Sequence, residues 1–260
     1  MLDSVKTKRF EMRYMRFGCG KDNLVILPGL SIKSVLNSAA AVESAYSSFK
    51  EKFTVWLFDR RENLPRTYKI KDMARDTAIA MLILKIKDAC IFGTSQGGMI
   101  AQCLAIYHPD LVSKLILGST ASRISSESHD VLQKWIDLAE SGNVSELKQS
   151  FAKAIYSEEL YKKAEKLFSS PMGETDEDLK RFVKLAKSSS GFDVYNDLDK
   201  IKCPVLVIGA ENDCVLGAKA SVEIAEKAGC DLYMYEGYGH AVYDEAPDYK
   251  ERMIAFLKKN

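Results

Sequence analysis

A serine in this 260-residue chain lies in a pattern typical of a nucleophile. Gly93 and Gly97 stand two residues either side of Ser95, directly after an apolar run and before a predicted helix. A sharp strand-to-helix turn crowds its own backbone, and only glycine fits at those two positions. The turn lifts the hydroxyl to a helix N-terminus, where negative charge is favoured. The pattern predicts nucleophilic attack on a carbonyl.

A serine nucleophile needs a base, and the chain has three histidines. His108 lies at the predicted end of the helix after Ser95, and His129 lies in a polar segment. His240 follows the last predicted strand in a glycine-containing loop. That loop can meet Ser95 at the carboxyl ends of the strands, where open α/β sheets place their sites. We therefore predict His240 as the base.

The base in turn needs a carboxylate that orients its ring. The expected chain order places this acid between the serine and the histidine. The segment after the predicted strand Val205–Ile208 offers two candidates, Glu211 and Asp213. Placement at the strand end favours Asp213 over Glu211.

The elements that must position these residues alternate between short apolar runs and longer amphipathic segments. This alternation predicts an α/β fold with a mostly parallel sheet covered by helices on both faces. The expected strands are Phe10–Phe17, Leu24–Leu27, Thr54–Phe58, Ala89–Phe92, Lys114–Leu117, Val205–Ile208 and Leu232–Tyr235. The expected core helices are Val35–Lys50, Ile70–Ile86, Gly97–His108, Ala218–Ala228 and a last one from near Pro247.

One stretch breaks the alternation, because residues 122–197 show helical periodicity without a strand signal. We predict an all-helical cap here, inserted into a core domain formed by residues 1–121 and 198–260. Such a cap would close an apolar pocket over the substrate. Its candidate lining residues are Trp135, Phe151, Tyr156, Phe168 and Phe182.

The composition narrows the possible partners. The net charge of +1 suggests neither nucleic acid nor an anionic membrane, so a small-molecule substrate is expected. No segment reads as a secretory signal or a bilayer span, and the six cysteines lack metal-ligand spacing. We predict a cytoplasmic protein that needs no metal and no other cofactor. Monomer and homodimer are both compatible with the sequence.

The residues from Gly93 to Gln102, from Ile208 to Asp213 and from Gly237 to Pro247 resemble the α/β-hydrolase superfamily. The resemblance is to its cap-bearing branch, which contains carboxylesterases, enol-lactone hydrolases and C–C bond hydrolases. It covers almost the whole chain and implies that Ser95, Asp213 and His240 form a catalytic triad. It also implies an oxyanion hole made by the backbone N–H groups of Leu30 and Gln96.

Three positions depart from the pattern of this branch. Pro28 replaces a histidine that many relatives carry, which predicts the loss of a polar contact beside the site. The loop from Asp59 to Pro65 keeps Asp59 and Arg61 but lacks two glycines, and Gly217 lies where a proline is common. All three concern the rim of the site, and hence the substrate.

The resemblance implies hydrolysis of an ester or related acyl bond through an acyl-enzyme on Ser95. An acyltransferase, a lactone hydrolase or a C–C bond hydrolase would use the same triad. A function of another class is a ligand sensor that keeps the fold and has little turnover. Turnover of activated esters that is lost in Ser95→Ala would separate an enzyme from a sensor.

Overall fold

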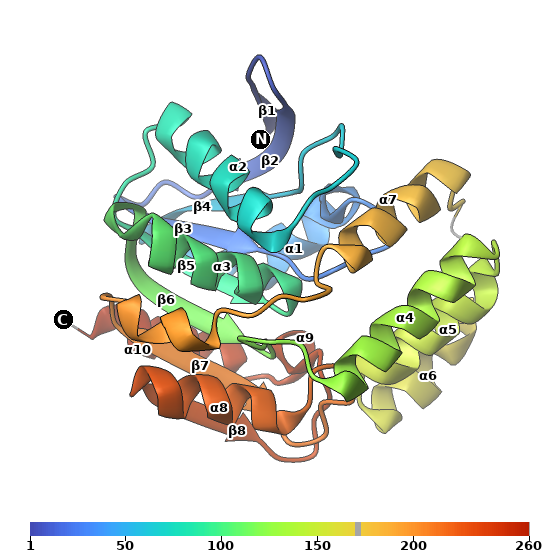
Figure 1. Cartoon of the computed structure of the whole chain (residues 1–260). Coiled ribbons are helices and arrows are strands. Elements are labelled where there is room, and N and C mark those ends of the chain that lie inside the picture. The colour runs from blue at the N-terminus through green and yellow to red at the C-terminus, as the bar shows by residue number, and fades with distance from the viewer. Residues whose placement is uncertain (170–172, 260) are drawn as a thin grey trace.

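A computed structural model describes residues 1–169 and 173–259, with only the backbone described for residues 167–169. The described residues form one eight-stranded sheet in the order β1-β2-β4-β3-β5-β6-β7-β8 (Figure 1). The strands are β1 Leu2–Lys6, β2 Glu11–Phe17, β3 Asp22–Leu27, β4 Phe53–Phe58, β5 Ala89–Thr94, β6 Val112–Gly118, β7 Val205–Ala210 and β8 Asp231–Tyr235. β1 and β2 run antiparallel to their neighbours, and the others pair in parallel. The predicted α/β fold is confirmed.

The α-helices of the described residues lie in connections between these strands, except α9 and α10, which follow the last strand. They are α1 Ala39–Ala45, α2 Ile70–Ile83, α3 Gln96–Tyr107, α4 Ser126–Glu140, α5 Val144–Ile155, α6 Glu158–Ser169, α7 Asp176–Lys187, α8 Ala218–Ala228, α9 Val242–Glu245 and α10 Tyr249–Lys258. Helices α4 to α7 lie in the connection from β6 to β7, and α4, α5 and α6 pack together at one end of the sheet (Figure 1). The predicted helical insertion between two core strands is confirmed.

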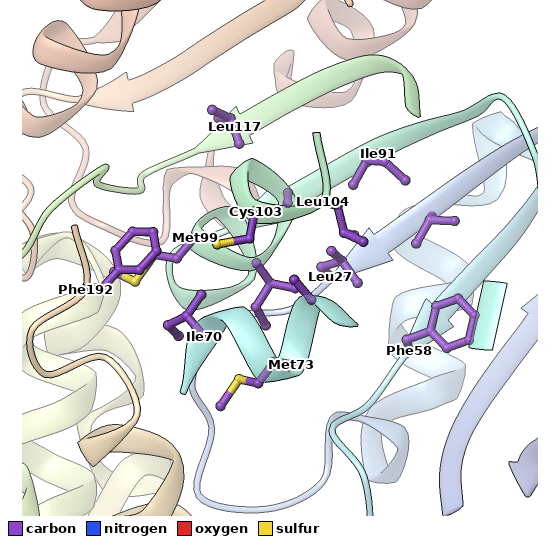
Figure 2. Close-up of a cluster of buried hydrophobic side chains, with 14 of the residues drawn as sticks. Leu27, Phe58, Ile70, Met73, Ile91, Met99, Cys103, Leu104, Leu117 and Phe192 are labelled. Atoms are coloured by element: carbon purple, nitrogen blue, oxygen red, sulfur yellow. The ribbon is translucent and has the colours of Figure 1, made fainter. Parts of the chain in front are cut away.

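The core lies on both faces of the sheet, as the continuous apolar runs predict. Alternate residues of β3 show this, because Val25 belongs to a first apolar cluster that includes residues of α2 and α3, whereas Ile26 belongs to a second cluster that includes residues of α10. Figure 2 shows part of the first cluster, to which α2 contributes Ile70 and Met73 and α3 contributes Met99, Cys103 and Leu104. Both faces are therefore covered.

Three sequence predictions need correction. β1 was not predicted, because this edge strand buries only Val5 and so carries little hydrophobic pattern. The predicted helix Val35–Lys50 is a short helix, α1, between the 3₁₀ turns Val35–Ser38 and Ser47–Phe49. The predicted helix Ile70–Ile86 ends at Ile83, since Lys85 has a φ of 59° and leaves the helical region.

Candidate active site

Ser95 is the single residue between β5 and α3. Its φ of 51° is unusual for a residue with a side chain, and it marks a strained turn. The Ser95 N–H donates to the carbonyl of Gly118 at 2.9 Å, and the Thr120 hydroxyl donates to the Ser95 carbonyl at 2.7 Å. Both partners lie at or just after the end of β6, so the sheet itself fixes this turn.

The two glycines that flank Ser95 are needed because the chain is crowded here. A Cβ atom at Gly97 would lie 2.0 Å from the carbonyl oxygen of Leu27, and one at Gly93 would lie 2.4 Å from the carbonyl oxygen of Gly97. Neither contact is physically allowed, so a side chain at either position would push the turn away from β3 or from α3. The glycine spacing seen in the sequence therefore has the expected steric origin.

His240 and Asp213 form a buried pair at the ends of β8 and β7. Nδ1 of His240 lies 2.8 Å from Oδ2 of Asp213, and each side chain is 3% exposed. Oδ1 of Asp213 accepts the N–H groups of Val215 and Leu216 at 2.8 and 2.9 Å. Burial raises the pKa of Asp213, but His240 and these two N–H groups outweigh burial and hold the pKa below its ordinary value.

The other candidates from the sequence lie elsewhere. Glu211, the alternative acid, is exposed, and only its backbone N–H has a described bond, to Tyr235. His108 caps the C-terminal end of α3, and His129 is exposed on α4. Among the described residues, His240 is the histidine that pairs with a carboxylate and lines a pocket.

Ser95 and His240 line one pocket with an internal volume of about 60 Å³. Because Nδ1 of His240 is paired with Asp213, Nε2 is the ring nitrogen left for the pocket side. The remaining lining is mostly apolar and comes from the core and from the insertion. It consists of Gly29, Leu30, Gln96, Met99, Leu132, Trp135, Phe151, Ile155, Ser189, Val215, Leu216 and Tyr243.

Only some of the cap residues that the sequence predicted as pocket lining do line the pocket. Trp135 and Phe151 line the pocket and pack on each other, with ring centroids 4.5 Å apart. Phe182 is fully buried behind Phe151, and Tyr156 is not among the lining residues. The Phe168 side chain lies outside the described residues.

The two predicted oxyanion donors, Leu30 and Gln96, line the pocket beside Ser95. A Cβ atom at Gly29 would lie 3.2 Å from Cβ of Ser95, so the loop before Leu30 lies close against Ser95. Gln96 is the first residue of α3, where a backbone N–H has no carbonyl partner within the helix. The arrangement is compatible with two N–H groups that receive an oxyanion, and that role stays a prediction.

The pocket, the turn and the buried pair can be compared with known proteins. A model of the alpha/beta hydrolase fold family matches residues 22–247. The chain belongs to the α/β-hydrolase family. This result confirms the resemblance that the motifs around Ser95, Asp213 and His240 indicate.

Individual α/β-hydrolases are similar at low sequence identity. Human monoacylglycerol lipase ABHD6 is 26% identical over 192 residues, which cover 68% of this chain and 56% of the lipase. The structure of MGS-M2, an alpha/beta hydrolase enzyme from a Medee basin deep-sea metagenome library, has a TM-score of 0.88 at 23% identity and covers 99% of this chain and 98% of that one. The enol-lactonase from Burkholderia xenovorans LB400 has a TM-score of 0.84 at 20% identity and covers 99% of this chain and all of its own. These two structural likenesses show the fold.

The sequence did not reveal how the insertion of this α/β-hydrolase contacts the loops of the core. The N–H of Ala241 donates to the carbonyl of Ile155 at 2.6 Å, and both Ser157 N–H and Ser157 hydroxyl donate to the Glu245 carboxylate. A further hydrogen bond joins the insertion to the residue after Ser95, because Nε2 of Gln96 donates to the Leu185 carbonyl of α7 at 2.7 Å. These residue types occur throughout helices and turns, so no sequence signal marks them.

The backbone at Pro28 makes a polar contact that its side chain cannot make. The Pro28 carbonyl accepts a hydrogen bond of 2.6 Å from the guanidinium of Arg60. The loss of a side-chain polar contact at position 28 stays a prediction. Arg60 itself was not singled out from the sequence.

The parts of the chain that the structure describes contain neither a metal-binding cluster nor a membrane-spanning helix. Within residues 1–169 and 173–259, no group of three His, Cys, Asp or Glu side chains is arranged to hold a metal ion. No helix in the same ranges has the length and apolar character needed to cross a bilayer. All six cysteines have free thiols.

Proposed function

We propose that this α/β-hydrolase is a serine esterase that cleaves small esters or lactones through an acyl-enzyme on Ser95. The observation that carries the proposal is the buried His240–Asp213 pair, which opens onto the same pocket as Ser95. A neutral imidazole with one nitrogen fixed by a carboxylate presents its other nitrogen as a base. That is the group that a serine hydroxyl requires.

In the proposed reaction, His240 takes the proton of Ser95 as the serine oxygen attacks the carbonyl carbon. The N–H groups of Leu30 and Gln96 receive the oxyanion, and His240 gives its proton to the leaving alcohol. His240 then takes a proton from water, whose oxygen attacks the acyl carbon, and returns it to Ser95 as the acid leaves. Asp213 stabilises the imidazolium in both steps.

The pocket supports an uncharged substrate with a short acyl group. Apart from His240, none of its lining side chains is of a type that carries charge at neutral pH, and Trp135, Phe151 and Leu132 present apolar surface. Burying a carboxylate in such a pocket without a partner would be costly. The helical insertion contributes this apolar roof and so would select the substrate.

A fluorophosphonate probe tests the proposal most directly, because it reacts with an activated serine. We expect one label on Ser95, located by peptide mass spectrometry, and none in Ser95→Ala. Ser119→Ala is the matched control, since Ser119 is buried at the end of the neighbouring strand and also has a positive φ, of 42°. A folded wild-type protein that is not labelled at Ser95 would overturn the proposal.

A substrate panel then identifies the reaction. p-Nitrophenyl acetate, butyrate and hemisuccinate compare a short, a longer and a carboxylated acyl group, and small lactones extend the series. We expect the neutral short esters or the lactones to be turned over and the hemisuccinate to be the poorest. Acyl transfer to an added alcohol in place of water would identify a transferase. Tight binding without turnover would identify a sensor.

We also propose that the protein acts on small molecules in the cytoplasm. The support is chemical, because free thiols are typical of a reducing compartment. Burial raises the pKa of Cys103 to about 12, so this thiol is an inert part of the core.

A further inference from the structure

Arg60 is a buried cation close to the pocket. It has no direct role in the proposed reaction. It follows β4 by two residues and is 5% exposed. Burial lowers the pKa of its guanidinium to about 10, so the group is still protonated at neutral pH. Its Nε is buried without a hydrogen-bond partner among the described residues. A buried cation is costly, so its position calls for an explanation.

The hydrogen bonds of Arg60 lead to the two loops that carry the predicted oxyanion donors. Its Nη2 donates to the carbonyl of Pro28 at 2.6 Å and lies 3.4 Å from Oε1 of Gln96. Pro28 lies two residues before Leu30, and Gln96 is the other donor residue. One guanidinium nitrogen therefore contacts both sides of the predicted oxyanion hole.

The orientation of the Gln96 amide supports this contact. Its Nε2 donates to the Leu185 carbonyl at 2.7 Å and to the Ser189 hydroxyl at 3.0 Å. A carbonyl can only accept, so the nitrogen of the amide must face Leu185 and the oxygen faces Arg60. The Arg60 backbone is held in turn, because Nη2 of Arg181 donates to the Arg60 carbonyl at 3.0 Å.

We propose that Arg60 is a positioning residue for the oxyanion hole. It holds the Leu30 loop and the Gln96 turn at a fixed separation, and it places a positive charge behind the two N–H donors. This inference rests on the proposed function, since an oxyanion must form for the position of the donors to matter. In an apolar pocket such fixed dipoles and charges stabilise a transition state strongly.

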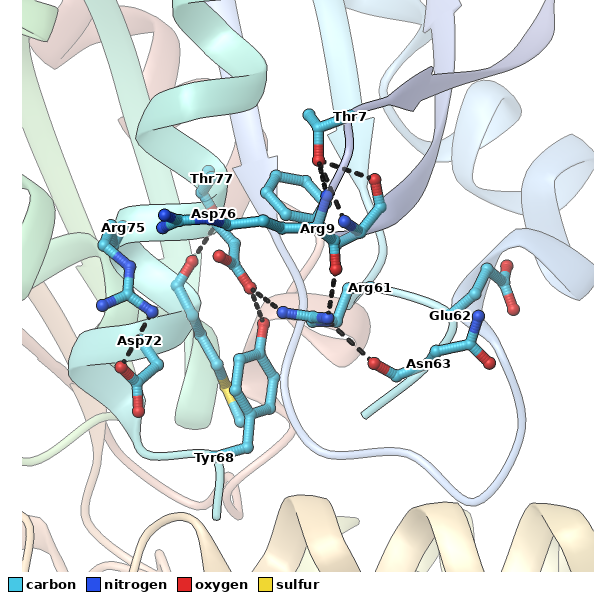
Figure 3. A network of polar contacts seen from close by, with 12 residues as sticks. Thr7, Arg9, Arg61, Glu62, Asn63, Tyr68, Asp72, Arg75, Asp76 and Thr77 are labelled. Atoms are coloured by element: carbon cyan, nitrogen blue, oxygen red, sulfur yellow. Dashed lines mark hydrogen bonds and ion pairs between the residues drawn. The ribbon is translucent and has the colours of Figure 1, made fainter. Parts of the chain in front are cut away.

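The next residue, Arg61, provides a matched control because its side chain bonds elsewhere. Its Nη1 lies 3.4 Å from the Asp76 carboxylate, its Nη2 donates to the Arg9 carbonyl at 2.7 Å and its Nε donates to the Asn63 carbonyl (Figure 3). Its loss should therefore reduce stability without moving either donor loop. Arg60→Met and Arg61→Met thus remove guanidinium groups from adjacent positions with different contacts.

The experiment compares kinetics and inhibitor binding in wild type and the two variants. For Arg60→Met we expect kcat on p-nitrophenyl acetate to fall about ten- to a hundredfold, because small displacements of catalytic groups have effects of this size. We expect KM to change little, and the affinity for a trifluoromethyl ketone, which forms an oxyanion on Ser95, to fall in parallel with kcat. Arg61→Met should keep the wild-type kcat and ketone affinity. Thermal unfolding shows how far each variant is destabilised.

Arg60→Lys serves if the methionine variant does not fold. It keeps the charge but has one compact ammonium, so we expect a smaller fall in kcat and in ketone affinity. Wild-type kcat and ketone affinity in the folded Arg60 variants would overturn the inference, as would equal losses in the Arg61 variant. A wild-type protein without turnover and without Ser95 labelling would instead overturn the proposed function.

Discussion

The Ser95 turn and the His240 loop are held in place by different parts of the molecule. The Ser95 backbone is hydrogen-bonded to Gly118 and Thr120, which both belong to the core. The two flanking glycines lie against backbone atoms of the core. Ala241, the residue after His240, instead donates a backbone hydrogen bond to Ile155 of the insertion. A Cβ atom at Gly239 would lie 3.1 Å from the same Ile155 carbonyl.

The backbones of the proposed nucleophile and of the proposed base therefore have different supports. The Ser95 backbone depends on the turn from β5 to α3 and on the end of the neighbouring strand β6, and the insertion reaches this turn only through the side chain of Gln96. The base depends on a helical insertion that lies between Asp213 and Ser95 in the chain and docks onto the histidine loop. Changes in the insertion should therefore affect proton transfer more than they affect the shape of the Ser95 turn.

The largest expected effect comes from removing the carboxylate behind the base. Asp213→Asn keeps the shape of the side chain but favours the wrong tautomer of His240, and we expect kcat to fall about 10⁴-fold. Steady-state hydrolysis of p-nitrophenyl acetate measures this change. Glu211→Gln is the control and should keep wild-type activity. The reverse result would make Glu211 the acid.

The next effect concerns the contact between the insertion and the histidine loop. Glu245→Ala removes the acceptor of both Ser157 hydrogen bonds, which loosens α9 directly after His240. We expect kcat to fall about tenfold, as a modest misplacement of the base implies. Ser157→Ala should have a smaller effect, because the Ser157 N–H still donates to Glu245. Glu251→Gln, at an exposed position on α10, is the control. An unchanged kcat in Glu245→Ala would refute the dependence on the insertion.

A smaller effect on kcat is expected from a change beside Ser95. Thr120→Val removes one donor to the Ser95 carbonyl, but the N–H groups of Gly98 and Met99 still donate to it at 2.9 and 3.2 Å. We expect kcat to stay within about threefold of wild type, with a stability loss of about 1 kcal/mol. Paired measurements of kcat and thermal unfolding test this. A loss of activity larger than that of Glu245→Ala would reverse the comparison.

The smallest effect is a pH dependence of stability. The folded-state pKa of Asp213 lies below its ordinary value, so the ionised form stabilises the fold above the unfolded pKa of about 3.9. That contribution disappears as the pH falls through the folded pKa. Melting temperatures of wild type and Asp213→Asn should therefore differ most above pH 5 and converge below pH 4. A gap that widens towards low pH would contradict the assigned shift.

The sequence predicted the elements that carry local signals. Seven strands appear near their expected places, because runs such as Val205–Ile208 are buried along their whole length. The Ser95 turn could be predicted because its glycine spacing is a pattern of five residues, although the crowding at Gly97 comes from Leu27 of β3. The missed strand β1 has one buried residue, Val5, and hence almost no pattern to detect.

The long-range contacts could not be predicted in the same way. Ile155 and Phe182 have the same apolar character in the sequence, yet Ile155 lines the pocket and Phe182 is buried behind it. Which face of the insertion meets the core depends on how four helices dock, and helical periodicity does not contain that information. Arg60 was missed for a related reason, since its partners are a distant backbone carbonyl and a side chain of α3.

The place of the insertion has a consequence for how the chain acquires its structure. Leu115 of β6 pairs with Val205 of β7, and all of α4 to α7 lies between them in the chain. Closing so long a loop is slow, and during synthesis β6 must wait until the insertion has been made. Until β7 arrives, the edge of β6, with its apolar residues Leu115, Ile116 and Leu117, has no partner strand. Chains that terminate inside the insertion should therefore aggregate more readily than the complete protein.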